Sequence, residues 1–139
     1  GGTPRAGRVT LDTMLSRSDV VSLHCPLTEA TLNLIDRDEL ASMKRSALLI
    51  NTARGGIVNE SALRNALQTG QIGGAAIDVL TEEPPRKGNP LLDEPLPNLI
   101  VTPHIAWAST HARQLLINEI SDNVLAFLDG KPRNVVVNS

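Results

Sequence analysis

Three short segments each place a reactive side chain just after a run of strand-forming residues. Arg54 precedes two glycines, Glu83 precedes two prolines, and His104 follows Pro103. A guanidinium binds a carboxylate through two parallel hydrogen bonds, and an imidazole held by a carboxylate can donate or accept a proton near neutral pH. Ligands of parallel α/β sheets bind beyond the carboxyl ends of the strands. These three side chains therefore predict one enzyme site that grips an anion and moves a proton.

Taken singly, each of these side chains also fits a simpler role: a turn arginine, a solvated loop glutamate, or a histidine bonded to a backbone carbonyl. Glu82 competes with Glu83 for the place beside the imidazole. We assign the simpler role to the two other histidines, because His24 lies late in a strand-like run and His111 opens a helix.

Two further side chains have open assignments. Asp78 ends a strand-like run, where its carboxylate could accept a hydrogen bond from a ligand amide or cap a turn. Cys25 lacks the neighbouring base that a nucleophilic cysteine needs, which favours a small residue that lines a groove or fills the core.

The elements that must position these residues alternate along the chain. Strands are expected at 19–24, 47–50, 73–80 and 98–102, and the proline-rich segment 82–97 is expected to be a loop. Helices are expected after caps at Thr10, Asp36, Asn59 and either Ser109 or Thr110, with Gly70 and Gly130 ending the last two. Asp36 and Glu39 have the spacing of a capping box. Residues 134–137 are expected to be extended.

Alternating strands and helices predict an α/β fold with a parallel sheet of the doubly wound, Rossmann-like kind. The apolar runs are continuous, which is typical of strands covered on both faces. We predict that residues 1–108 form the C-terminal part of a dinucleotide-binding domain. Residues 109–139 are expected to form a long helix and tail that return to a separate substrate domain.

Composition limits the class of protein. The 139 residues carry 13 basic and 15 acidic side chains with no basic block, which argues against nucleic acid or an anionic membrane as partner. The apolar runs fall far short of the roughly 20 residues that span a bilayer. A single cysteine excludes a disulfide framework and a multi-cysteine zinc site, so no metal site is predicted. These features predict a cytoplasmic protein.

The amino-terminal residues Gly1 to Arg8 are expected to form a loop, and no initiating methionine precedes them. We therefore expect the chain to be a piece of a longer protein.

From Leu11 to Val136 the sequence resembles the D-isomer-specific 2-hydroxyacid dehydrogenases. Five blocks carry the resemblance: Val21 to Thr28 (VSLHCPLT), Leu49 to Gly56 (LINTARGG), Ala76 to Val79 (AIDV), Glu83-Pro84, and Thr102 to Ile105 (TPHI). Long blocks in one order are highly specific. The resemblance implies a two-domain, homodimeric oxidoreductase that uses NAD or NADP, with NAD favoured, and acts on a small 2-oxoacid or D-2-hydroxyacid.

The resemblance also implies roles for individual residues. Arg54 would bind the substrate carboxylate and carbonyl, His104 would be the proton donor, and Glu83 rather than Glu82 would pair with it. Asp78 would contact the nicotinamide. The remaining cofactor contacts implied are Cys25, Pro26, Thr52, Ala53, Arg54, His104, Ala106 and Trp107.

The substrate expectation rests on finer likenesses. Formate dehydrogenases resemble this family but carry glutamine where Glu83 stands, so the glutamate favours a hydroxyacid. Trp107 and the ending at 130–136 are similar to the glycerate dehydrogenase, or hydroxypyruvate reductase, branch, which implies hydroxypyruvate or glyoxylate as substrate.

One departure from the family is plain. The Gly-x-Gly-x-x-Gly turn and the acidic residue about 20 positions later have no counterpart in this sequence. Two alternatives therefore stay open: a catalytically incompetent fragment that serves as a binding or oligomerisation module, and a corepressor-like relative that acts through protein partners.

Overall fold

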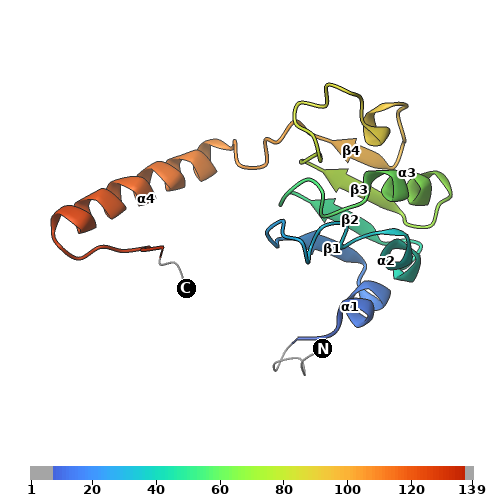
Figure 1. Cartoon of the computed structure of the whole chain (residues 1–139), viewed down its shortest axis with the longest axis horizontal. Coiled ribbons are helices and arrows are strands. Elements are labelled where there is room, and N and C mark those ends of the chain that lie inside the picture. The colour runs from blue at the N-terminus through green and yellow to red at the C-terminus, as the bar shows by residue number, and fades with distance from the viewer. Residues whose placement is uncertain (1–7, 137–139) are drawn as a thin grey trace. The chain divides into compact units, whose positions relative to one another are not determined.

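The structure is a computed structural model that describes residues 8–136. It divides into two units, the first ending at His104 and the second beginning at Ile105. The loop expected at Gly1 to Arg8 lies, except for Arg8, outside the described residues. The first unit contains, in order, α1 (Leu11–Arg17), β1 (Val20–Leu23), α2 (Arg37–Ser42), β2 (Leu48–Asn51), α3 (Glu60–Gln68), β3 (Gly74–Ile77), the 3₁₀ turn η1 (Pro90–Leu92) and β4 (Leu99–Val101) (Figure 1).

Helix starts in the first unit follow local side-chain chemistry. The Thr10 hydroxyl accepts from the N–H of Thr13 at 3.3 Å, and the Asn59 side chain accepts from the N–H of Ala62 at 3.1 Å. Asp36 and Glu39 form the predicted capping box. These side chains bind N–H groups that the first helical turn leaves without a backbone partner. The three predicted caps are confirmed.

The four strands form one parallel sheet in the order β1-β2-β3-β4, as the alternation of elements predicted. Their register brings the last residues into one row, because Leu23 pairs with Asn51, Asn51 with Ile77, and Ile77 with Val101. The segments after β2, β3 and β4 consequently leave the sheet at the same edge. This edge is where the candidate side chains were expected.

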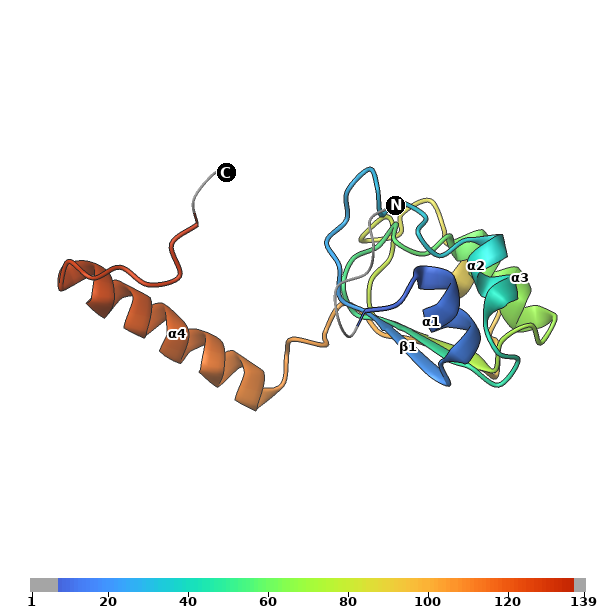
Figure 2. The same ribbon diagram turned by 90° about the horizontal axis from the view of Figure 1, so that it is seen from below.

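The core of the first unit lies between the sheet and α1, α2 and α3, which cover one face (Figure 2). Val21, Leu23 and Leu49 point into it, whereas their neighbours Val20 and Leu48 are exposed. Among residues 8–104, no helix covers the second sheet face, so the expectation of cover on both faces is not met within this part of the chain. Exposed positions of this face nevertheless include the apolar side chains of Val20, Leu48 and Ile100.

Several element boundaries differ from the sequence expectation. β3 ends at Ile77 rather than Leu80, although the N–H of Asp78 still donates to the Asn51 carbonyl at 2.9 Å. The segment expected to be only loop contains η1, which begins at a proline and is capped by the side chain of Asn89. Proline suits this place because a helical first turn does not need its N–H.

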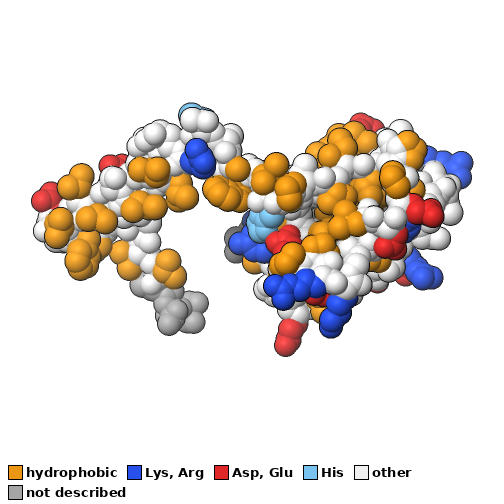
Figure 3. Space-filling view, turned by 90° about the horizontal axis from the view of Figure 1, so that it is seen from above, with side chains coloured by type: hydrophobic (Ala, Val, Ile, Leu, Met, Phe, Trp, Pro, Cys, Tyr) orange, Lys and Arg blue, Asp and Glu red, His pale blue; other side chains and the backbone are white. Residues whose placement is uncertain are grey.

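The second unit contains α4 (Thr110–Leu128), which is capped by Ser109 and followed by Gly130 at a positive φ of 70°. None of its 19 residues is buried in the described part of the chain. Apolar side chains along this helix are exposed to solvent (Figure 3). The helices formed by residues 8–136 include none that is both long and apolar enough to cross a membrane.

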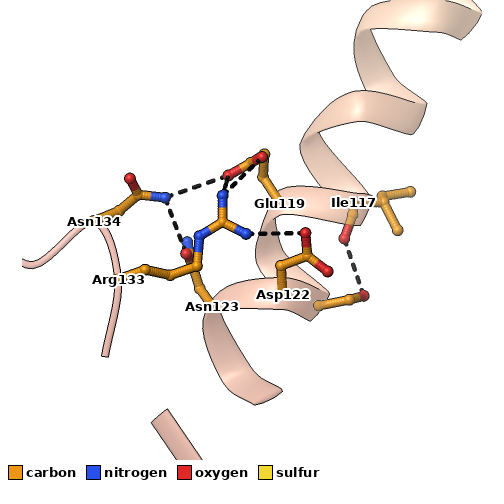
Figure 4. Close-up of polar contacts among 7 residues, drawn as sticks. Ile117, Glu119, Asp122, Asn123, Arg133 and Asn134 are labelled. Carbon is orange, nitrogen blue, oxygen red and sulfur yellow. Dashed lines mark hydrogen bonds and ion pairs between the residues drawn. The ribbon is translucent and has the colours of Figure 1, made fainter. Parts of the chain in front are cut away.

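The segment after α4 folds back on the helix through Arg133. Its guanidinium binds Glu119 at 2.8 Å and Asp122 at 2.9 Å, while Asn134 donates to Glu119 and to Asn123 (Figure 4). Residues 134–136 form no strand, and Asn134 has a positive φ of 53°. The expected extended stretch is therefore wrong at Asn134, and its last residue, Val137, lies outside the described residues.

Candidate active site

The turn that carries Arg54 is closed by a buried asparagine. Asn51 Nδ2 donates to the Arg54 carbonyl at 3.0 Å, and Asn51 Oδ1 accepts from the N–H of Ala53 at 3.1 Å. Gly56 follows at a φ of +82°, a conformation that glycine adopts at little cost. The guanidinium of Arg54 donates to the Ala53 carbonyl at 2.6 Å and is exposed. The predicted sharp turn is thus confirmed, and it presents Arg54 at the carboxyl edge of the sheet.

Gly55 brings this turn against the segment that follows β3. A Cβ atom built on Gly55 would lie 1.9 Å from the carbonyl oxygen of Leu80 and 2.7 Å from the nitrogen of Thr81. No side chain fits into that space, so only glycine allows the two backbones to approach this closely. The loop that carries Glu83 is therefore seated directly on the turn that carries Arg54.

Glu83 and His104 are in direct contact. Glu83 Oε2 lies 2.7 Å from His104 Nδ1, and Glu83 Oε1 accepts from the N–H of Leu80 at 2.7 Å. Both side chains are partly exposed, at 35% and 43%. Glu82, the competing glutamate, is exposed. An imidazole whose Nδ1 is held by a carboxylate directs its other ring nitrogen away from that carboxylate, as a general acid or base requires.

The carboxyl group of Glu83 is shifted toward ionisation. Its hydrogen bond with His104 is the largest cause that holds the pKa of Glu83 below its ordinary value, and partial burial is the main opposing influence. The Leu80 N–H and the positive charge on the imidazole also lower this pKa, whereas the charge of Asp78 raises it. A glutamate in this setting is a stable anion beside the histidine.

The backbone of His104 adopts a rare conformation. Its φ is +56°, in the left-handed region that non-glycine residues seldom occupy, and its N–H donates to the Thr102 carbonyl at 3.0 Å. Such a conformation costs about 1–3 kcal/mol and is concentrated at functional sites. The tight turn after β4 aims the imidazole at Glu83 instead of continuing the strand.

Asp78 lies at the base of the same edge. It is buried, with 3% of its surface exposed, and accepts a hydrogen bond from the Thr102 hydroxyl at 2.5 Å. This bond ties the end of β3 to the end of β4, two residues before His104. The expected placement of Asp78 at a strand end is confirmed, one residue past β3.

Two hollows flank this edge. The first, of about 560 Å³, is lined by Leu80, Glu83, Pro84, Pro85, Leu92, Val101, Thr102, Pro103 and His104. The second, of about 660 Å³, is lined by His24, Cys25, Pro26, Leu27, Thr52, Ala53 and Arg54. The structure thus gathers the expected cofactor residues of the β1 and β2 ends in one hollow. The Glu83–His104 pair lines the other, so Arg54 and the pair face different hollows.

The remaining candidates are placed as follows. Ala106 and Trp107 belong to the second unit, and their expected cofactor contacts stay predictions. His24 bonds to the Ser22 hydroxyl at 2.8 Å, a side-chain partner rather than the expected backbone carbonyl.

Residues 3–106 match the model of the family described as "D-isomer specific 2-hydroxyacid dehydrogenase, NAD binding domain". The chain belongs to this family. The match includes every candidate catalytic residue, from Arg54 to His104, and confirms the family that the sequence blocks indicated.

Individual dehydrogenases and reductases are similar over most of the chain. Glycerate dehydrogenase of Methylorubrum extorquens is 59% identical over 96% of this chain and 42% of its own length. Hydroxypyruvate reductase of Blautia hydrogenotrophica is 41% identical over 92% of this chain and 39% of its own. The NAD-complexed D-isomer specific 2-hydroxyacid dehydrogenase of Lactobacillus delbrueckii ssp. bulgaricus is 35% identical, with a TM-score of 0.78 over 94% of this chain and 43% of its own. The chain therefore spans about 40% of the length of these relatives.

Two contacts of this dehydrogenase-family site were missed by sequence reasoning. The Leu80 N–H binds Glu83, and Glu60, at the start of α3, binds the loop that carries Glu83. A backbone donor carries no sequence signal. Glu60 directly follows the helix cap Asn59, and an acidic residue in the first turn of a helix is common, so its position gave no sign of a contact with the loop.

Proposed function

We propose that this chain is the catalytic part of an NAD(P)-dependent 2-hydroxyacid dehydrogenase that reduces a short 2-oxoacid, such as hydroxypyruvate or glyoxylate, to the D-2-hydroxyacid. The observation that carries the proposal is the Glu83–His104 contact of 2.7 Å at the carboxyl edge of a parallel sheet. The family match and the names of the similar glycerate dehydrogenase and hydroxypyruvate reductase favour this substrate class.

The residues around the second hollow fit part of a dinucleotide. Small and apolar side chains of Cys25, Pro26 and Ala53 line it, and it lies beyond the ends of β1 and β2, where such folds bind nucleotides. Asp78 would accept from the carboxamide of the cofactor. A bound NADH or NADPH would supply the hydride, with NAD favoured by the description of the matching family as an NAD binding domain.

Each catalytic side chain has one task in this proposal. Arg54 binds the carboxylate of the 2-oxoacid through its planar guanidinium and polarises the ketone. His104 Nε2 donates a proton to the alkoxide oxygen as it develops, and takes one in the reverse direction. Glu83 fixes the Nδ1 side of the ring and stabilises the charged imidazole, as the acid of a catalytic triad does.

The proximity of the two backbones supports this division of tasks. Gly55 follows Arg54 directly and lies against Leu80, whose N–H holds Glu83. Leu80 lines the hollow of the Glu83–His104 pair and Arg54 lines the other hollow, so the contact of Gly55 with Leu80 joins the walls of the two. A substrate between them would reach Arg54 with its carboxylate and His104 with its carbonyl oxygen.

His104→Ala tests the mechanism in the complete protein, which we take to be longer than this chain, as its relatives are. Turnover of hydroxypyruvate and glyoxylate should fall by about 10²- to 10⁴-fold, because a general acid contributes that much. His111→Ala, in α4, is the matched control and should keep wild-type turnover. Wild-type turnover by the His104 variant on every 2-oxoacid tried would overturn the mechanism.

The long helix has its own place in the proposal. The apolar side chains of α4 are uncovered in the described part of the chain, and the chain spans about 40% of its relatives. We infer that α4 and the tail pack on a substrate domain that lies outside this chain, within a homodimer.

The uncovered apolar side chains of α4 also favour a second candidate function, a non-catalytic binding module. Titration of the 139-residue chain with NADH, followed by nicotinamide fluorescence, separates the two. Tight saturable binding counts against the module. No turnover by the complete protein would favour the module or a corepressor-like relative.

A further inference from the structure

The loop between β3 and β4 carries Glu83, yet it contains little regular structure to hold it. Only η1 interrupts residues 78–98, and Glu83 itself is partly exposed. A side chain on a loop tip keeps a 2.7 Å contact only when the backbone beneath it is anchored. The contacts that anchor the backbone around Glu83 therefore affect the geometry of the Glu83–His104 pair.

Helix α3 supplies the anchor through its first residue. Glu60 Oε1 accepts from the N–H of Thr81 at 2.8 Å, and Glu60 Oε2 accepts from Asn89 Nδ2 at 2.9 Å. Asn89 is buried, and its Oδ1 accepts from the N–H of Leu91 at 2.9 Å. One carboxylate thus binds both ends of the segment 81–89, in which Glu83 lies.

The bond to Thr81 lies next to the group that orients Glu83. The Leu80 N–H, one residue earlier, binds Glu83 Oε1, while the Leu80 carbonyl rests against Gly55. Three neighbouring contacts thereby fix one stretch of backbone, and Glu60 provides the one that binds the N–H of Thr81. Charge-assisted hydrogen bonds of this kind are stronger than neutral ones.

We propose that Glu60 is a positioning residue for the Glu83–His104 pair: it fixes the 81–89 loop so that the Glu83 carboxylate reaches His104 Nδ1. Its effect on turnover rests on the proposed function, whereas its effect on the contact does not. Glu60 acts through the backbone at residues 80 and 81, because its carboxylate binds the N–H of Thr81 and the neighbouring N–H of Leu80 binds Glu83.

A double-mutant cycle in the complete protein tests the proposal. Glu60→Ala should lower kcat roughly 10- to 100-fold with little change in KM for NADH, since small misplacements of a catalytic group cost that much. In a Glu83→Gln background the same substitution should have no further effect on kcat. Independent effects that multiply would overturn the proposal, because they would show that Glu60 does not act through Glu83.

Arg64 provides a matched control on the same helix and the same loop. Its guanidinium donates to the carbonyls of Pro90 at 2.7 Å and Glu94 at 3.2 Å, beyond the segment that carries Glu83. Arg64→Leu should loosen the far end of the loop and leave kcat within about twofold. An equal loss of kcat in the Arg64 and Glu60 variants would indicate general loosening and would count against positioning.

A second readout does not depend on activity. The Nδ1 proton of His104, observed by NMR in histidine-labelled protein, should report a strong bond to a carboxylate in the wild type and lose that signature in Glu60→Ala. Glu60→Gln, which keeps an acceptor for Thr81, should retain it in part and serves if the alanine variant does not fold. An unchanged signature in both variants would overturn the inference, and a wild-type protein that reduces no 2-oxoacid would overturn the proposed function alone.

Discussion

At the scale of single residues, the histidine–glutamate pair has the features of an acid–base device. His104 holds a left-handed backbone conformation, and Glu83 binds it with one oxygen and the Leu80 N–H with the other. Each carboxylate oxygen therefore has a defined donor. The pair is oriented by the fold before any substrate binds, which is how electrostatic and acid–base groups become effective.

The lowered pKa of Glu83 makes stability depend on pH in a predictable sense. Because its pKa is lower in the folded state, the ionised carboxylate stabilises the fold fully above the ordinary value of about 4.5, and this contribution is lost as pH falls through the folded pKa. Glu83→Gln should therefore destabilise the chain near neutral pH and approach wild-type stability in acid. Denaturant unfolding of both proteins across this range measures the difference, which should not stay constant.

At the scale of elements, the site depends on two turns, one after β2 and one after β3, whose backbones pack against each other at Gly55 and Leu80. The β2 turn is closed by Asn51, and the segment after β3 is held by Glu60. Gly55 lies between them and permits the contact. The rigid parts are the strand ends, whose aligned register sets where each turn begins.

Gly55→Ala tests this close approach. The added methyl group would meet the carbonyl oxygen of Leu80, a backbone atom that cannot rotate away, so we expect a loss of about 2–3 kcal/mol in unfolding free energy. Gly70→Ala is the control, because no atom lies within 4 Å and only its positive φ opposes the methyl group, at about 1 kcal/mol. Equal losses at the two glycines would contradict the predicted contact.

At the scale of the whole molecule, the first unit exposes apolar side chains on one face of its sheet. Val20, Leu48 and Ile100 are 53%, 45% and 65% exposed on the sheet face opposite the helices. A doubly wound sheet buries that face as well. The chain is about 40% of the length of its relatives, so we expect the complete protein to supply the cover.

Leu48→Lys distinguishes a sheet face that stays open from one that the complete protein covers. In the isolated chain the side chain is half exposed, and we expect the substitution to change stability by less than about 0.5 kcal/mol. In the complete protein a lysine at a covered position should cost about 2–4 kcal/mol, since an apolar contact is lost and a charge is buried. Equal effects in the two proteins, measured by denaturant unfolding, would argue that this face stays open.

The parallel fold, the helix caps and the family were predictable from the sequence. Capping depends on one side chain and the backbone a few residues away, as at Asn59, and strand–helix alternation is a local pattern. Blocks such as Leu49 to Gly56 carry the family because their residue types meet local turn requirements. Such information lies within a few neighbouring positions.

Contacts between distant positions were decided by the tertiary structure. The family resemblance selected Glu83 over Glu82, but the contact of Glu83 with His104 and the anchoring of its loop by Glu60 each join residues 21 positions apart. The exposure of one sheet face likewise depends on which segments pack on it. Local propensity carries no record of such pairings, because they arise only when the strand ends align and bring separate loops to one edge.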